Sequence, residues 1–292
     1  MMPHEEKSEI KNIFAQAVEQ NPQAGEILKA FEPIIIRQRQ LAALSSFRNL
    51  DCSLIDKEKL KAGVPISRQI NLFMSDNSLK EIAISMASAV AEGMPQLAEN
   101  IDRIADLIQK GKINPADYFK SPVEGEKDKA SDWAKDLKIS SSNAIFLMTL
   151  ISRVVLEQRA IEIKTALKEL DWDKGYCPVC GSFPSIAMIE EKGGRRFLHC
   201  SSCGHDWRFT RVICPACEND ASDGMDYFYV ENKTHEAAFI CDKCKKYLVT
   251  LYRVGDFLAR DMDVSAISLI HLDMIMQGKG YEPMAACLWN VL

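Results

Sequence analysis

Apolar residues recur at helical spacing along much of the first half of the chain. The recurrence covers residues 7–19, about 24–49 and 78–111, and it predicts helices in these three segments. Pro33 falls within the second segment and should kink or divide it, because proline cannot donate the helical hydrogen bond. The pattern therefore predicts an all-helical N-terminal domain.

Polar stretches in the same half predict where further helices begin and where a loop lies. The run Ser140–Asn143 should start a helix with a buried, apolar middle that continues to about residue 170. Asp76-Asn77-Ser78 and Asn114-Pro115 resemble helix starts. The charged stretch 122–132 predicts an exposed loop.

The second half changes to short runs of β-prone residues separated by turns. The runs predict two hairpins, 185–190 with 195–199 and 225–230 with 235–240. Gly193-Gly194 and Asn232 supply the residues that hairpin turns favour. We therefore expect two small antiparallel ribbons in succession.

Four Cys-x-x-Cys pairs, or knuckles, punctuate these ribbons. They are Cys177/Cys180, Cys200/Cys203, Cys214/Cys217 and Cys241/Cys244, and the intervals between them are 19, ten and 23 residues. Two knuckles can complete a tetrahedral four-sulfur shell, which suits structural zinc and rubredoxin-type iron alike. The spacing predicts two four-cysteine metal sites, the first from the first two knuckles and the second from the last two. A cross-braced pairing, first with third and second with fourth, stays open.

Disulfides and redox thiols are the alternatives to metal. A disulfide framework suits short secreted chains, whereas this chain has 292 residues and opens without an apolar signal core. A redox motif would be a single Cys-x-x-Cys near a βαβ pattern. Four pairs at regular intervals favour metal, and the isolated Cys52 and Cys287 are better explained as small buried apolar residues.

The two ribbons resemble each other and have little core of their own. CysProValCys at 177–180 matches CysProAlaCys at 214–217, and Gly181 and Gly204 follow their knuckles where a left-handed turn residue is favourable. Metal binding would supply much of the folding free energy, on the order of 10 kcal/mol for a structural zinc.

Composition favours a protein of two or more domains that does not bind nucleic acid in general. The chain is 47% hydrophobic and has a net charge of −5. We expect a helical domain at 1–172, a first four-cysteine ribbon at 173–212, and a second four-cysteine ribbon with a C-terminal helix at 213–292. No stretch has the length of apolar residues that a membrane span needs.

One local segment departs from the acidic balance. Five basic residues lie between 192 and 211 and face a single acid, Asp206, in the sequence. An exposed strand edge would explain them, because edge strands carry charge that blocks pairing with other chains. A contact surface for an acidic partner would also explain them, with Trp207 either as an anchor for that partner or packed over the metal knuckle. The partner-binding candidates are Arg195, Arg196, Trp207, Arg208 and Arg211.

The sequence offers no catalytic constellation. It contains no Gly-rich phosphate loop and no His-Glu-x-x-His motif. His199 and His205 lie near knuckles, but four cysteines already complete each shell. His199 fits a half-buried strand position, and His205 could hydrogen-bond a thiolate.

The knuckles and their neighbours resemble one known family. The resemblance lies in CysProValCysGlySerPhePro at 177–184, ArgPheLeuHisCysSerSerCys at 196–203, CysProAlaCysGluAsn at 214–219 and CysAspLysCys at 241–244, with Trp207 and Arg211 between them. Together these are similar to FdhE-type accessory proteins of formate dehydrogenase. Residues 261–281 resemble the family's final helix, while the family's Asn-Pro near the C-terminus is not evident here.

The resemblance implies a cytoplasmic maturation factor and not an enzyme. Such a factor binds the catalytic subunit of a formate dehydrogenase before that subunit is assembled or exported, and it inserts into no membrane. The fold implied is α+β, with an N-terminal helical domain, two tandem rubredoxin-like or zinc-ribbon units and a C-terminal helix. Two metal ions, iron by family or else zinc, would be held by the eight knuckle cysteines. A homodimer stays open.

Two other classes of protein use similar sites. A rubredoxin-like electron-transfer protein would hold iron in the same four-sulfur shells. A nucleic-acid-binding zinc ribbon would use the basic stretch 192–211, and its affinity would fall steeply with salt. The acidic net charge makes nucleic acid the weaker alternative.

Overall fold

The computed structural model describes most of the chain. The described residues are 4–43, 50–73, 78–119, 129–165, 167, 171–220, 224–254 and 260–290. They form two compact units, one of residues 1–11, 29–50 and 71–159, and one of residues 12–28, 51–70 and 160–292. The predicted cap residues Asp76 and Asn77 and most of the predicted loop 122–132 lie outside the described residues.

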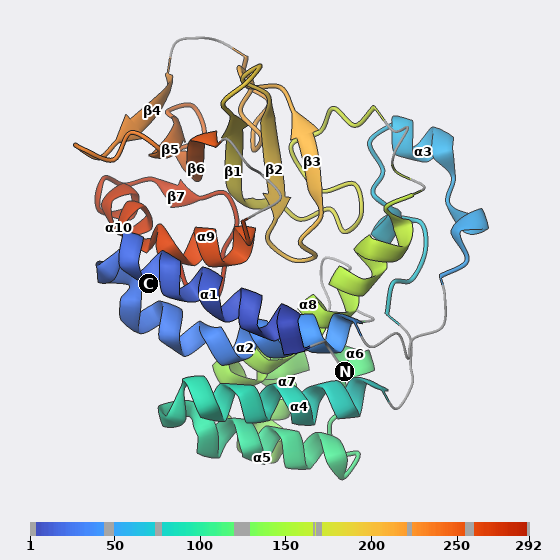
Figure 1. The fold of residues 1–292 in the computed structure, drawn as a ribbon. Helices are drawn as coiled ribbons and strands as arrows, with labels where there is room; N and C mark the ends of the chain where they lie inside the picture. The colour runs from blue at the N-terminus through green and yellow to red at the C-terminus, as the bar shows by residue number, and fades with distance from the viewer. Residues whose placement is uncertain are drawn as a thin grey trace. The chain divides into compact units, whose positions relative to one another are not determined.

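The regular structure before residue 184 is helical wherever it is described. The α-helices are α1 (His4–Gln20), α2 (Gly25–Ala43), α3 (Lys57–Lys61), α4 (Ser78–Gly93), α5 (Ala98–Gln109), α6 (Pro115–Phe119), α7 (Lys129–Leu137) and α8 (Ser141–Ile163), shown in Figure 1. Single 3₁₀ turns lie at Pro22–Ala24, Cys52–Leu54, Ile66–Arg68 and Pro95–Leu97. None of the described helices combines the length and the apolar character of a membrane span.

The helical predictions hold with differences at four places. Pro33 lies inside α2, which stays one helix, whereas the predicted segment 78–111 divides at Pro95 into α4 and α5. Helix α8 ends at Ile163, several residues before the predicted end. The predicted loop at 122–132 is wrong for its last residues, because α7 begins at Lys129. The predicted cap is confirmed: Asn114 Oδ1 accepts from the amide of Ala116.

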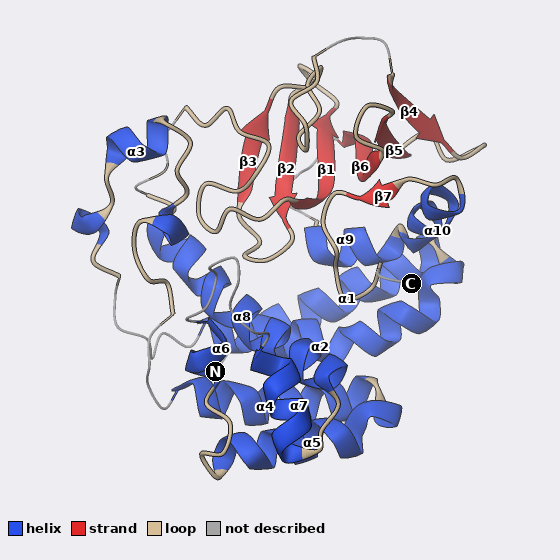
Figure 2. Ribbon diagram, turned by 180° about the vertical axis from the view of Figure 1, so that it is seen from behind, coloured by secondary structure: helices blue, strands red, loops and turns tan. Residues whose placement is uncertain are grey.

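The second half forms one mixed sheet. Its strands are β1 (Pro184–Glu190), β2 (Arg196–Cys200), β3 (Asp206–Phe209), β4 (Met225–Tyr229), β5 (Glu236–Cys241), β6 (Lys246–Val254) and β7 (Glu282–Pro283). The order is β3-β2-β1-β6-β5-β4, with β7 beside β6 (Figure 2). The two predicted hairpins are therefore confirmed as β1 with β2 and β4 with β5, and β3 and β6 are further strands that the sequence analysis did not predict.

The sheet differs from two separate ribbons in one respect. Strands β1 and β6 pair in parallel, with Met188 opposite Leu251, so the two ribbons share a continuous ladder. β1 is buried along nearly its whole length, as a central strand should be. The sequence does not reveal this pairing, because it joins strands that are far apart along the chain.

Two helices at the end of the described chain cover one face of this sheet. They are α9 (Met262–Ser268) and α10 (Ile270–Gly278), and they lie against the strands in Figure 1. The core between them contains Ile186, Met188, Val249 and Leu251 from the sheet and Met262, Ala266, Leu272 and Met276 from the helices. Asp261 caps α9 by accepting from the amides of Asp263 and Val264. The expected C-terminal helix is confirmed as this pair of helices.

Candidate metal centres

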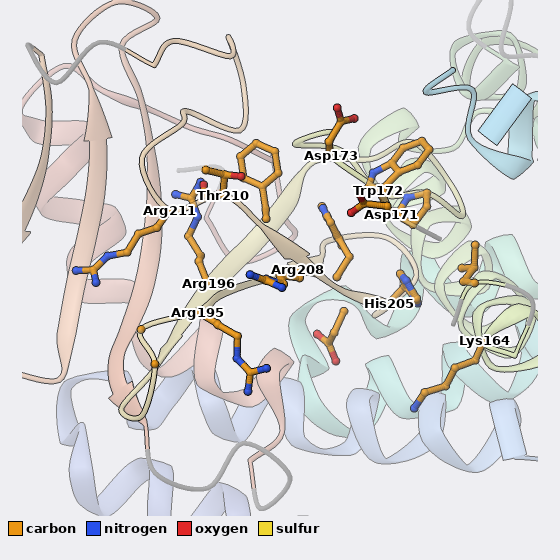
Figure 3. Close-up of a pocket in the computed structure, with 17 residues that line it drawn as sticks. Lys164, Asp171, Trp172, Asp173, Arg195, Arg196, His205, Arg208, Thr210 and Arg211 are labelled. Carbon is orange, nitrogen blue, oxygen red and sulfur yellow. The ribbon is translucent and has the colours of Figure 1, made fainter. Parts of the chain in front are cut away.

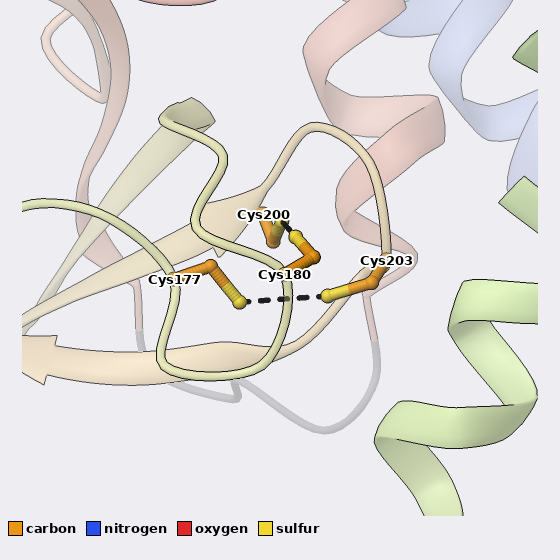
Figure 4. Close-up of side chains that lie close together, drawn as sticks. All are labelled: Cys177, Cys180, Cys200 and Cys203. Atoms are coloured by element: carbon orange, nitrogen blue, oxygen red, sulfur yellow. Dashed lines mark hydrogen bonds between the residues drawn. The ribbon is translucent and has the colours of Figure 1, made fainter. Parts of the chain in front are cut away.

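The first four knuckle cysteines meet at one end of β1 and β2. Cys177 and Cys180 lie in the turn before β1, Cys200 ends β2, and Cys203 lies in the turn that leads to β3. Figure 4 shows the four side chains pointing toward one another. The Sγ atoms of Cys177 and Cys203 are 3.5 Å apart, and those of Cys180 and Cys200 are 3.3 Å apart.

The other four cysteines repeat this arrangement in the second ribbon. The Sγ atoms of Cys214 and Cys244 are 3.8 Å apart, as are those of Cys217 and Cys241. In each group all four sulfurs lie within 4.8 Å of one another. The local pairing of knuckles is therefore observed, and the cross-braced alternative is not.

The knuckles share a backbone conformation that turns the chain around the sulfurs. The residue after the second cysteine of each knuckle has a positive φ: Gly181 81°, Gly204 67°, Glu218 54° and Lys245 55°. In the first three knuckles its amide donates to the carbonyl of the first cysteine, as Gly181 N does to Cys177 O at 2.9 Å. The two glycines were predicted from their position. Glu218 and Lys245 were not, because non-glycine residues seldom adopt this conformation.

Both groups fit a tetrahedral four-thiolate metal site. A metal–sulfur bond of about 2.3 Å places tetrahedral sulfurs about 3.8 Å apart, close to the distances in both groups. Burial raises the pKa of Cys177 and of Cys203, because it disfavours an isolated thiolate. A cation at the centre would make the thiolate forms favourable, so this donor set suits zinc or iron and does not separate them.

The two groups differ in how far they are covered. In the first group only Cys180 is partly exposed, whereas in the second both Cys217 and Cys244 are. The segment 64–70 lies against the first knuckle: the amides of Ile66 and Ser67 donate to Pro178 O and Val179 O, each at 2.9 Å. Ser67 Oγ also donates to Cys180 O at 2.9 Å, across 113 positions of sequence. This support for the first site comes from far upstream and has no signal in the sequence.

His199 lies beside the first group but binds carboxylates. Its Nδ1 is 2.7 Å from Asp206 Oδ1 and its Nε2 is 3.3 Å from Asp263 Oδ1. Burial disfavours the charged ring, but Asp263 and Asp206 outweigh burial and raise the pKa of His199 to about 10. His199 therefore joins β2, β3 and α9 as a buried cation. The two aspartates had no visible link to it in the sequence.

His205 has a different environment. Burial lowers the pKa of His205, so the ring is neutral, and its backbone carbonyl accepts from the amide of Cys200 at 3.0 Å. Neither histidine belongs to a cysteine group.

The predicted partner-binding residues lie at very different depths. Arg196 is 1% exposed, with its guanidinium near the rings of Phe209 and Phe239 and its Nη2 donating to the carbonyls of Thr210 and Ile213. Trp207 is 5% exposed and donates from Nε1 to Lys174 O at 3.1 Å. Arg208 is exposed, and Arg195 is paired with Glu190 at 2.6 Å. Any role of these residues in partner binding stays a prediction.

A cavity of about 750 Å³ lies beside this strand. Figure 3 shows Lys164 and Trp172 opposite Arg195 and Arg208 around it. Five cationic side chains and three aspartates line it: Lys164, Arg195, Arg196, Arg208 and Arg211, with Asp171, Asp173 and Asp206. The knuckle cysteines are not among its lining residues.

Comparisons with known proteins agree with the knuckle sequences. Residues 176–211 match the family domain described as "FdhE, central domain". "Protein FdhE homolog" of Aquifex aeolicus is 27% identical over 90% of this chain and 88% of its own length. "Protein FdhE" of Salmonella choleraesuis is 26% identical over 93% of this chain and 86% of its own length.

The fold also matches a solved structure. The crystal structure of the FdhE protein from Pseudomonas aeruginosa has a TM-score of 0.64 with this chain, at 22% identity, and covers 98% of this chain and 95% of that one. At this identity the structural match concerns the fold alone, whereas the sequence matches extend along nearly all of the chain. Together with the match to the central domain at 176–211, they show that the chain is similar to FdhE proteins along nearly all of its length.

Proposed function

We propose that this protein is an accessory factor for a formate dehydrogenase and not an enzyme itself. It binds the dehydrogenase's catalytic subunit in the cytoplasm and is needed for the assembly or activity of that subunit before export. The observation that carries the proposal is the pair of four-cysteine groups in a sheet whose first ribbon matches the FdhE central domain. The similarity to FdhE proteins supports the link to formate dehydrogenase.

The eight cysteines would hold two metal ions, and these ions would cross-link the hairpins. The cysteine thiolates would coordinate the ions, and this coordination would tie each pair of knuckles together. The chain's own residues do the rest: the left-handed Gly181 and Gly204 close the turns, and the amides of Ile66 and Ser67 hold the first knuckle in place. The rigid ribbons then present loops and strand edges to the client.

Capture of the client tests this proposal. The tagged full-length chain is purified from cells that contain or lack the catalytic subunit, with metal content measured on the same sample. We expect the wild type to recover the subunit with two metal ions per chain. The Cys177→Ser/Cys180→Ser double variant should lose one ion and most of the recovered subunit.

Cys52→Ser is the matched control, because Cys52, which was expected to be buried, is exposed and belongs to neither cysteine group. It should recover the subunit as the wild type does. Full formate dehydrogenase activity in cells that lack the protein would defeat the proposed role altogether. Equal recovery by the double variant and the wild type would show that the first ribbon does not form the client site.

An electron-transfer role with iron is the second candidate. The partial exposure of Cys217 and Cys244 favours it, because an exposed thiolate edge gives a donor access to the metal. Two results together would favour this role over the accessory one. The purified protein would be reduced reversibly by a physiological donor, and deletion of the protein would leave dehydrogenase assembly unchanged.

A further inference from the structure

Strand β3 leaves one side of its backbone without a neighbouring strand. Among the described strands it is the terminal one of the sheet, and its partner is β2 alone. The Cys200 amide donates to His205 O, and the register places Leu198 opposite Trp207. Since hydrogen-bonded and non-hydrogen-bonded pairs alternate in an antiparallel ladder, the backbone groups of Asp206 and Arg208 face away from β2. They form an open edge.

The cavity lies along this edge. Residues 205–211 all line it without a gap, although successive side chains of a strand point to opposite faces of the sheet. A cavity lined by residues whose side chains point to both faces of the sheet runs along the edge of the strand and not over one face. Its volume of about 750 Å³ is enough for a short stretch of extended polypeptide.

The charge around the edge favours an acidic occupant. Cationic side chains outnumber aspartates in the lining, while the chain as a whole has a net charge of −5. Two of the aspartates are already paired, Asp206 with His199 and Asp173 with Lys174. Arg208 is exposed and makes no ion pair with any described residue, so its charge is available to a ligand.

We propose that the open edge of β3 binds an extended acidic segment of the client polypeptide as an additional strand. The segment's backbone pairs with Asp206 and Arg208. Its acidic side chains lie on the face of the sheet that carries Arg208, and its apolar side chains lie on the face of Trp207 and Phe209, both of which are buried. The identity of the occupant as a client segment rests on the proposed function.

Peptide binding to the metal-loaded full-length chain tests the edge itself. The probe is a fluorescein-labelled octapeptide of alternating valine and glutamate, measured by fluorescence anisotropy. A lysine version tests charge, and a version N-methylated at alternate amides tests backbone pairing. We expect only the unmethylated acidic peptide to bind, with an affinity that falls as salt rises.

Substitution of Arg208 separates this edge from the rest of the surface. Arg208→Glu should raise the Kd of the acidic peptide about tenfold or more, and Arg208→Lys should keep it within about threefold of wild type. Arg68→Glu is the control, since Arg68 is exposed and does not line the cavity. Equal binding by wild type and Arg208→Glu, equal binding of the methylated peptide, or no binding of the acidic peptide would overturn the proposal.

Capture of the catalytic subunit by the same variants separates this proposal from the proposed function. Recovery by the wild type, with recovery by Arg208→Glu lower by about fivefold or more, supports both. Equal recovery by wild type and Arg208→Glu rejects the edge as the client site and leaves the accessory function standing. No recovery by the wild type rejects the accessory function. It also rejects a client segment as the occupant of the edge. The peptide measurement still decides whether the edge binds acidic strands.

Discussion

At Gly175 the backbone leaves no space for a side chain. A Cβ at this position would lie 2.0 Å from Pro215 O and 2.4 Å from Pro215 Cα, so the obstacle is backbone that cannot rotate away. Pro215 belongs to the knuckle that holds Cys214 and Cys217. A single missing side chain thus lets the segment before the first ribbon pass directly against the second metal site.

We therefore expect Gly175→Ala to lower the free energy of unfolding by about 1–3 kcal/mol, the usual cost of overpacking. It should also weaken metal retention at the second group more than at the first. Thermal unfolding and metal content per chain measure the two effects. Gly278→Ala in α10 is the control, because a Cβ there meets nothing within 4 Å. An unchanged unfolding free energy for Gly175→Ala would contradict the close approach.

At this scale the sequence predicts what depends on neighbouring residues and misses what depends on distant ones. The cysteine groups were predictable because ligand spacing within a knuckle is local. The closeness of Gly175 to Pro215 was not, since nothing in a lone glycine indicates which backbone it will meet. The burial of Arg196 was missed for the same reason, as its aromatic neighbour Phe239 lies in the other ribbon.

Strand β6 and helix α10 are joined by a buried hydrogen bond between two ionisable side chains. Tyr247 Oη donates to Asp273 Oδ1 at 2.6 Å, and both residues are 1% exposed. Burial raises the pKa of Asp273 to about 6, even though the hydrogen bond from Tyr247 and the nearby His271 act in the opposite direction. The carboxyl is therefore harder to ionise in the folded protein than in the unfolded chain.

A raised pKa makes this carboxyl destabilising as the pH rises. The folded-state pKa of about 6 lies above the unfolded value near 3.8, so the stabilisation is complete below the unfolded value and is lost as pH rises through 6. We expect the free energy of unfolding of wild type, relative to Asp273→Asn, to fall by about 1–2 kcal/mol between about pH 5 and pH 8.

Denaturant unfolding of both proteins at each pH measures this difference. Asparagine can still accept the hydrogen bond from Tyr247, so the variant removes the titration and keeps the contact. The other titrating groups are common to both proteins and cancel. A difference that stays constant with pH, or that grows toward acid pH in favour of the variant, would rule out a raised pKa for Asp273.

Elements were predicted well where their signal is periodic. The strands of both hairpins follow β-prone runs and turn residues, and the helices of the first half follow helical spacing, as seen in β1 and α4. The parallel pairing of β1 with β6 was not predicted, because it depends on which apolar strands meet after both hairpins have formed. The division at Pro95 was overlooked although proline is a local signal.

For the whole molecule, the two cysteine groups differ in how exposed they are to solvent. We expect this difference to decide which group releases its metal ion first. The first group has one partly exposed cysteine and is held by segment 64–70, while the second has two partly exposed cysteines. We expect a chelator to remove the two ions in two phases that differ about tenfold or more in rate, the faster phase from the second group.

Cys180→Ser and Cys217→Ser form a matched pair for assigning these phases, since each removes one partly exposed ligand. Metal release is followed with a coloured chelator in excess. Cys217→Ser should abolish the fast phase, and Cys180→Ser should abolish the slow one. A single phase in the wild type, or the opposite assignment, would show that cover does not govern release.

The parallel ladder between β1 and β6 also limits which fragments of the chain could be expressed alone. The segment that matches the family domain, 176–211, ends before β6 begins. A fragment with only these residues would leave β1 with an unpaired edge, and β1 is apolar along most of its length. An unpaired apolar strand edge can pair with the same edge of another molecule, which leads to aggregation. The ribbon that matches the family domain therefore needs the rest of the chain to remain soluble and monomeric.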